Sequence, residues 1–376
     1  MKESITFLTK RIENNLTKDV INLTEAIQDS DLELTVGPEK EREITLELVR
    51  VTEAAALRAS RWMGRGNKER ADKAAVDAMR GMLDYVNIDG TVVIGEGEKD
   101  KAPMLYIGEK VGNRCSGAVK VDIAVDPLDG TTLTAMGLPN AISVIAIGDK
   151  GSLMKVPCFY MEKLAYGPEL KGFMDINTSI STNIKIAAAK LGCEIGDIIV
   201  IILDRPRHKK IIEDVRKVGA RIRLISDGDV AGVLCTAIED FDAHLYAGIG
   251  GSPEAVLSAA GLKCLGGEIQ TKFWIQNEEE KRKVMEAGYT DLEEVFFTED
   301  LAKGTGIIFS ATGVTGGYLL SGVKYTKNKA ITHSIVMRAR TSTVRYVKAI
   351  HNLEKKTVPS RDKNKEVGIR DTGDIS

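Results

Sequence analysis

The chain has 376 residues and a mass of 40.9 kDa, enough for two to three packed units with sizeable cores. Its 52 basic and 54 acidic residues give a net charge of −2, which argues against a protein built mainly to bind nucleic acid or an anionic membrane surface. With 43% hydrophobic and 28% charged residues, the composition is typical of a globular protein rather than a disordered one.

Targeting signals and cysteine spacing further limit the class of protein. The sequence has no apolar run long enough to span a bilayer, and the charged N-terminus MKESITFLTKRIENN lacks the apolar core of a signal peptide. The five cysteines are far apart and include no CxxC pair, so we expect buried free thiols in a cytoplasmic protein. These cysteines are Cys115, Cys158, Cys193, Cys235 and Cys264.

Taken in chain order, residues 1–40 are charge-rich and indicate an N-terminal extension that ends near Gly37-Pro38. Apolar residues at helical spacing then predict helices over residues 44–62 and 71–86. Short apolar runs predict strands that are buried on both faces, at residues 91–94, 119–125, 141–147, 198–203, 222–225 and 307–310. Helical patterns between several of them predict helices at 209–218, 230–238 and 253–260.

This alternation of strands and helices predicts an α/β fold in which helices cover mixed sheets. We expect two lobes around a cleft, residues 41–182 and 183–358, with a boundary near Thr182. Residues 359–376 are polar and have no periodic apolar face, so they predict a mobile polar tail.

Carboxylates follow the ends of four strand-like runs. They lie in the segments Gly95–Glu98, Asp126–Thr132, Asp227–Asp229 and Gly248–Glu254. In open α/β sheets the loops at the strand C-termini meet at one ligand-binding crevice. Carboxylates gathered there would repel one another without a cation between them, and Mg²⁺ or Mn²⁺ is the natural occupant because hard divalent cations take oxygen ligands.

Each segment also has an ordinary explanation. Asp and Gly favour turns, so Asp227-Gly228-Asp229 alone is more often only a turn, and Glu96 and Glu98 are ordinary for an exposed loop. Asp126–Thr132 is more specific, because it follows a buried strand directly and leads to a helix start whose free N–H groups favour phosphate. The combination indicates a metal-assisted phosphate site.

The sequence lacks the motifs of several other binding and catalytic sites. The sequence has no Gly-Lys dipeptide and therefore no P-loop, and Gly248–Gly251 lacks the third glycine of a dinucleotide fingerprint. The four histidines form no HExxH motif, and Ser252 is not in a GxSxG elbow. Histidine–zinc and serine-triad chemistry are therefore disfavoured.

The second half of the chain supplies positive charge. Arg205-Pro206-Arg207-His208 follows the predicted strand at 198–203, and two arginines there can clamp a phosphate with paired hydrogen bonds. The alternative is a solvated basic turn at the start of a helix.

Together with these features, seven segments give the sequence a resemblance to the class II fructose-1,6-bisphosphatases. The resemblance includes the bifunctional cyanobacterial fructose-1,6/sedoheptulose-1,7-bisphosphatases, a branch of the lithium-sensitive, metal-dependent sugar and inositol phosphatases. It runs from about Glu41 to Leu353. The segments are Gly64–Arg80, Val93–Gly112, Val121–Thr132, Arg205–His208, Asp227–Val230, Tyr246–Glu254 and Ile307–Gly317.

The resemblance implies a layered α-β-α-β-α sandwich, with a metal- and phosphate-binding lobe at 41–182 and a sugar-phosphate-binding lobe at 183–358. It implies hydrolysis of the C1 phosphate of fructose 1,6-bisphosphate, in gluconeogenesis or the reductive pentose phosphate cycle. Sedoheptulose 1,7-bisphosphate is an additional or alternative substrate. A non-catalytic sugar-phosphate sensor is a more distant alternative. Ser252-Pro253-Glu254 stands where the wider superfamily has WDxAA, which disfavours an inositol monophosphatase.

The resemblance also implies roles for individual residues. Asp72 and Glu96 would hold one Mg²⁺ or Mn²⁺ ion, and Asp126, Asp129 and Glu254 another. Without the resemblance, Asp72 is simply an acidic residue in the first turn of a helix. The implied catalytic residues are Thr131, Glu96, Glu98 and Asp126. The implied substrate-binding residues are Asp129, Gly130, Thr131, Tyr160, Arg205, Pro206, Arg207, Asp227, Gly228, Asp229 and Gly251.

The expected partners are a small sugar bisphosphate and further copies of the chain, as a homodimer or homotetramer. Nucleic acid and membranes are not expected as partners.

Overall fold

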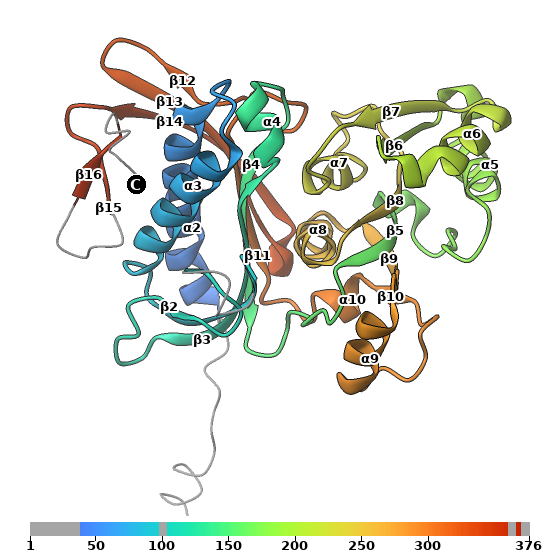
Figure 1. Ribbon diagram of the computed structural model, residues 1–376, viewed down its shortest axis with the longest axis horizontal. Coiled ribbons are helices and arrows are strands. Elements are labelled where there is room, and N and C mark those ends of the chain that lie inside the picture. The colour runs from blue at the N-terminus through green and yellow to red at the C-terminus, as the bar shows by residue number, and fades with distance from the viewer. Residues whose placement is uncertain (1–37, 98–103, 360–365, 370–376) are drawn as a thin grey trace, which may run out of the picture. The chain divides into compact units, whose positions relative to one another are not determined.

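The computed structural model describes residues 38–97, 104–359 and 366–369, which all belong to one unit of the chain, Thr35–Ser376 (Figure 1). The expected N-terminal extension lies almost entirely outside the described residues, as does Glu98. None of the helices in the described part combines the length and hydropathy that crossing a bilayer requires.

The five helices expected from the sequence are present, with ends set by local capping. Asn67 caps one of them by accepting a hydrogen bond from the Arg70 N–H at 2.9 Å. The expected helices are α2 (Pro38–Ala59), α3 (Lys68–Leu83), α6 (Lys209–Val218), α7 (Val230–Cys235) and α8 (Ser252–Leu265). The helix start indicated after Asp126–Thr132 is α4 (Thr131–Met136), and the structure adds α5 (Ile180–Leu191), α9 (Glu278–Glu286) and α10 (Thr298–Leu301).

The strands form two large mixed sheets in the described part of the chain. The first has the order β12-β13-β11-β4-β3-β1-β2, and an eighth strand, β14, also pairs with β13. Its strands are β1 (Ile88–Ile94), β2 (Lys110–Val111), β3 (Val119–Asp129), β4 (Ile142–Asp149), β11 (Ile308–Gly313), β12 (Lys324–Tyr325), β13 (Lys329–Arg338) and β14 (Thr343–Asn352).

The second sheet has the order β10-β9-β5-β8-β6-β7. Its strands are β5 (Tyr160–Tyr166), β6 (Ile199–Leu203), β7 (Arg221–Ile225), β8 (Leu245–Gly251), β9 (Glu268–Phe273) and β10 (Phe296–Phe297). All six strands predicted from apolar runs are confirmed. The strand β7 differs from expectation in burial, because it is an edge strand and Leu224 is 39% exposed.

Layers of helices alternate with the two sheets (Figure 1), and three apolar cores pack against the faces of these sheets. Ile123 belongs to the first core, which joins α2 and α3 to one face of the first sheet. Ala124, the next residue of β3, lies in the second core with Leu257 of α8, between the sheets. Ile184 of α5 and Val200 of β6 belong to the third core, on the outer face of the second sheet. The layered α-β-α-β-α sandwich is therefore confirmed.

The expected lobe boundary near Thr182 does not coincide with the division between the sheets. The strand β5 precedes Thr182 but pairs with β8 and β9 of the second sheet. The strands β11, β13 and β14 follow it but belong to the first sheet. The chain thus enters the second sheet at β5 and returns to the first at β11.

Two further expectations need correction. Cys158, Cys235 and Cys264 are buried, but Cys193 is only half-buried and Cys115 is exposed, although all five thiols are free. The start of the expected polar tail belongs to a strand, because β15 (Thr357–Pro359) pairs with β16 (Glu366–Gly368). The next residue, Ile369, is fully buried in the first core together with Val358, which anchors this hairpin.

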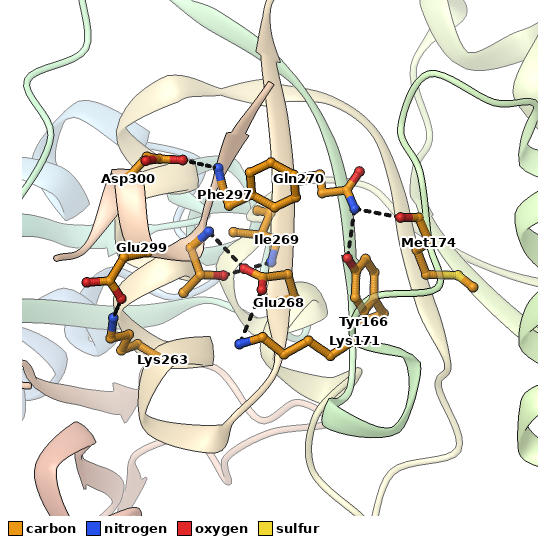
Figure 2. Close-up of polar contacts among 11 residues, drawn as sticks. Tyr166, Lys171, Met174, Lys263, Glu268, Ile269, Gln270, Phe297, Glu299 and Asp300 are labelled. Carbon is orange, nitrogen blue, oxygen red and sulfur yellow. Dashed lines mark hydrogen bonds and ion pairs between the residues drawn. The ribbon is translucent and has the colours of Figure 1, made fainter. Parts of the chain in front are cut away.

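Polar contacts link β9 to the neighbouring strand β5 and to the segment that follows β5, as Figure 2 shows. The Gln270 side-chain amide donates to the Tyr166 hydroxyl and to the Met174 carbonyl, each at 2.8 Å. Glu268 forms an ion pair with Lys171 at 3.2 Å. These contacts lie outside the cavity described next.

Candidate active site

The C-terminal ends of parallel strands position the site in both sheets. The strands β1 and β3 run parallel in the first sheet, and β6 runs parallel to β7 and β8 in the second. The segments after these strands carry the carboxylates and arginines predicted from the sequence, so the expected convergence at strand ends is observed.

A cavity of about 610 Å³ collects these segments. All of the predicted site residues line it except Pro206, which begins a short turn after β6 and is exposed, and Glu98, which lies outside the described residues. The cavity has further lining residues to which the sequence analysis gave no individual role. They are Gly95, Val125, Leu128, Phe159, Leu203, Gly250 and Pro253.

The segment Asp126–Thr132 leaves β3 with a break in its sheet register between Asp126 and Asp129. The Asp126 carboxylate accepts a hydrogen bond from the Leu128 N–H at 3.0 Å, which fixes the turn. Gly130 has φ +99°, in the left-handed region that favours glycine, and α4 begins at Thr131. The backbone thus turns sharply enough to present Asp126, Asp129 and Thr131 to one cavity.

Burial and mutual repulsion raise the pKa values of the carboxylates in the cavity. Burial, followed by the charge of Glu69, raises the pKa of Asp72 to about 6. Burial, together with the charges of Asp72 and Glu254, raises the pKa of Glu96 to about 8. Burial and the neighbouring carboxylates likewise raise the pKa of Asp126 and of Asp129 well above the ordinary aspartate value.

Three buried carboxylate oxygens in this cavity have no hydrogen-bond partner within the described part of the structure. They are Asp129 Oδ2, Asp229 Oδ1 and Glu254 Oε2. Buried, unpartnered oxygens among mutually repelling carboxylates fit hard divalent cations by their donor chemistry. Among the described residues, the side chains as placed do not form a group of three or more His, Cys, Asp or Glu ligands around one point.

Two arginines at the end of β6 form the basic side of the cavity. The Arg205 guanidinium lies 3.1 Å from an Asp227 carboxylate oxygen. The Arg207 guanidinium donates to the Ile249 carbonyl at 2.8 Å and lies over the Tyr160 ring, 5.2 Å from its centre. Strands β7, β8 and β5 therefore orient both arginines, which indicates more than the solvated basic turn considered as the alternative.

His208 holds the turn after β6 in place through two hydrogen bonds of its ring. Its Nε2 accepts a hydrogen bond from the Ile249 N–H at 2.7 Å, so the ring proton is on Nδ1, which donates to the Leu203 carbonyl at 2.7 Å. The neutral ring thereby joins the end of β6 to β8, next to Arg207.

Sequence reasoning missed the buried polar group behind the cavity. Lys163 Nζ lies 2.7 Å from Asp229 Oδ2, and the Tyr246 hydroxyl donates to the same oxygen at 2.9 Å. The signal in the sequence is the alternation of Met161, Lys163 and Ala165, which places a lysine on the buried face of β5.

Comparisons with known proteins agree with the chemistry of this cavity. The family model described as bacterial fructose-1,6-bisphosphatase, glpX-encoded, matches residues 42–351. The chain is 45% identical over 327 residues to fructose-1,6-bisphosphatase 1 class 2 of Escherichia coli strain K12, covering 84% of this chain and 97% of the relative. The same values relate it to the class 2 enzyme of Shigella flexneri.

Among solved structures, an extragenic suppressor from Pyrococcus furiosus aligns with 55% of this chain and 74% of its own, at 15% identity and a TM-score of 0.29. That score is too low to support a conclusion.

Proposed function

Because the chain belongs to the family of bacterial class 2 fructose-1,6-bisphosphatases, we propose that this cavity hydrolyses fructose 1,6-bisphosphate to fructose 6-phosphate and phosphate. The observation that carries the proposal is the convergence of carboxylates from β1, β3 and β8 with arginines from β6 on one cavity. The carboxylates suit a metal-assisted attack on a phosphate, and the arginines suit a second phosphate.

The family is metal-dependent, and we assign Mg²⁺ or Mn²⁺ to the carboxylate side. Asp72 and Glu96 would hold one ion, and Asp126, Asp129 and Glu254 another. Support comes from the unpartnered oxygens of Asp129 and Glu254 and from the raised pKa values of Asp72, Glu96, Asp126 and Asp129. When bound, divalent cations supply positive charge to the phosphoryl oxygens and favour ionisation of the attacking water.

The C1 phosphate would lie at the segment Gly130–Thr132, whose backbone N–H groups stabilise negative charge on the phosphoryl oxygens. The Thr131 hydroxyl orients the water for attack on phosphorus, opposite the P–O bond that breaks to release the C1 oxygen of the sugar. Glu96 accepts the proton of that water. The next acidic residue, Glu98, is the alternative acceptor.

The opposite end of the substrate would lie at Arg205 and Arg207. Their guanidinium groups bind the distal phosphate, while Tyr160, Asp227 and Asp229 contact the sugar. Binding energy from this non-reacting end holds the C1 phosphate in position for attack. The enzyme would act as a homodimer or homotetramer.

A substrate panel tests this proposal. Phosphate release is measured with Mn²⁺ and with Mg²⁺ on fructose 1,6-bisphosphate, sedoheptulose 1,7-bisphosphate and inositol 1-phosphate. We expect turnover of fructose 1,6-bisphosphate and none of inositol 1-phosphate, and the second sugar tests the dual specificity. Binding of fructose 1,6-bisphosphate without turnover in either metal would instead indicate a sugar-phosphate sensor.

A further inference from the structure

A fully buried lysine lies behind the cavity, and the reaction outlined above does not use it. The Lys163 side chain has no exposed surface, and its neighbours on the same face of β5, Met161 and Ala165, belong to the apolar core between the sheets. A buried ammonium is unfavourable unless a charge and hydrogen bonds compensate it. Within the described residues, its hydrogen bond goes to Asp229, at 2.7 Å.

The partner, Asp229, is anchored through only one of its two oxygens. Oδ2 accepts hydrogen bonds from Lys163 Nζ at 2.7 Å and from the Tyr246 hydroxyl at 2.9 Å. Oδ1 is buried and has no hydrogen-bond partner among the described residues, and Asp229 itself lines the cavity. Oδ1 is therefore the atom that is left to accept a hydrogen bond from a ligand.

The backbone of β8 makes room for this ion pair at Gly250. A Cβ atom at that position would lie 2.1 Å from Asp229 Oδ2 and 2.9 Å from Lys163 Nζ. Any other residue at Gly250 would displace the carboxylate or the ammonium. Glycine at this point is therefore a condition for the observed position of Asp229.

We infer that Lys163 is a positioning residue for fructose 1,6-bisphosphate hydrolysis. Together with Tyr246 it fixes Asp229 Oδ2, so that Asp229 Oδ1 remains free to accept a hydrogen bond from a hydroxyl of the sugar. Lys163 does not line the cavity and acts on the substrate through Asp229. The inference rests on the sugar-binding role that the proposed function gives to Asp229.

The test compares four variants with the wild-type protein: Lys163→Met, Asp229→Asn, the double variant, and the control Lys171→Met. The control breaks the ion pair between Lys171 and Glu268, a buried carboxylate in the same sheet but outside the cavity (Figure 2). Steady-state kinetics are measured on fructose 1,6-bisphosphate and on p-nitrophenyl phosphate, which has no sugar. Calorimetry measures the Kd of fructose 6-phosphate.

For Lys163→Met and for Asp229→Asn we expect kcat/KM on the bisphosphate to fall about tenfold or more, mainly through KM, with less than about a threefold change on p-nitrophenyl phosphate. The Kd of fructose 6-phosphate should rise by a similar factor. Both residues act through one contact, so their effects should not multiply. The kcat/KM of the double variant on the bisphosphate should lie within about threefold of that of the less active single variant. Lys171→Met should leave both substrates within about twofold of wild type.

Equal losses on both substrates, or losses that multiply in the double variant, would overturn the inference. A large effect of Asp229→Asn with none from Lys163→Met would also overturn it while leaving the proposed function intact. No effect of Asp229→Asn would refute the sugar-binding role of Asp229 and the inference with it.

Gly250→Ala provides a second route if Lys163→Met does not fold, since it displaces the same pair without removing a charge. It should give the same rise in the Kd of fructose 6-phosphate, whereas Gly196→Ala, with nothing closer than 3.9 Å, should not. Wild-type Kd in Gly250→Ala would count against the inference.

Discussion

Gly228, after the last residue of β7, lies against the carboxylate of Asp129 at the end of β3. A Cβ atom on Gly228 would be 2.9 Å from Asp129 Oδ1, and the residue has φ +64°. This contact lies between a segment of the second sheet and a strand of the first, at the point where the proposed sugar and phosphate sites meet. It also explains why the Asp-Gly-Asp turn, which is ordinary as a sequence pattern, matters in this fold.

The first prediction tests that approach with Gly228→Ala. The added methyl group should displace Asp129, so we expect kcat/KM on fructose 1,6-bisphosphate to fall by about tenfold or more. Gly172→Ala is the matched control, because Gly172 has φ +81° but nothing within 4 Å of its Cβ position. Both variants should lose about 1–2 kcal/mol of stability to left-handed backbone strain. Equal activity of the two would show that the contact has no role.

The second prediction concerns the arginine clamp. Removal of the Arg207 guanidinium by Arg207→Ala should cost about 1.5–3 kcal/mol of bisphosphate binding, or about 10- to 100-fold in KM. Hydrolysis of p-nitrophenyl phosphate should stay within about twofold, because that substrate has no distal phosphate. Lys210→Ala is the control, since Lys210 is a nearby, exposed cation outside the cavity. Equal losses on both substrates would remove Arg207 from distal recognition.

The third prediction separates two adjacent threonines. Thr131 lines the cavity, whereas Thr132 is exposed and does not line it. Thr131→Ala should lower kcat about 100-fold or more with little change in KM, since it removes a group that orients the attacking water. Thr131→Ser should recover most of the rate, and Thr132→Ala should resemble wild type. An unchanged kcat in Thr131→Ala would contradict the proposed role of Thr131.

The fourth prediction concerns pH and metal removal. The folded protein raises the pKa of Glu96 to about 8 from an ordinary value of 4.5. In EDTA, stability from this group is complete below about pH 4.5 and is lost as pH rises through 8, because the folded state binds the proton more tightly. The melting temperature of metal-free protein should therefore fall between pH 5 and 8, and Glu96→Gln should flatten this slope.

Added Mn²⁺ should reverse that loss, since a cation stabilises the ionised carboxylates. Thermal melts across pH with EDTA and with Mn²⁺ measure both effects. A melting temperature that is independent of pH in EDTA and unchanged by Mn²⁺ would contradict the carboxylate site.

The sequence predicted the parts of the site that short segments encode. Asp126–Thr132 follows a buried strand, and the arginines follow another, so their place at strand ends could be inferred from local pattern alone. Asp72 is different, because the sequence pattern alone predicts only an acidic residue in the first turn of a helix, whereas the structure places it in the second turn of α3, which begins at Lys68. Only the resemblance to a known family assigned it to the site, and only packing of α3 brings it to the cavity.

The features that could not be predicted depend on contacts between residues far apart in the sequence. Pairing of Ile308 with Ile147, which returns the chain to the first sheet, leaves no local mark in either segment. The same is true of Ile369, because most of the core that buries it comes from residues far away in sequence, such as Ile44. Lys163 was missed because a single lysine in a strand is usually solvent-facing, and its partner Asp229 lies far along the chain.

Phosphate release from fructose 1,6-bisphosphate, measured for wild type and Asp126→Asn with Mn²⁺ and with EDTA, tests the central claim most directly. The account predicts release by wild type only with the metal, and a rate at least about 100-fold lower for Asp126→Asn at the same metal concentration. Equal release by the two proteins, or no release by wild type above background in Mn²⁺ or Mg²⁺, would contradict it.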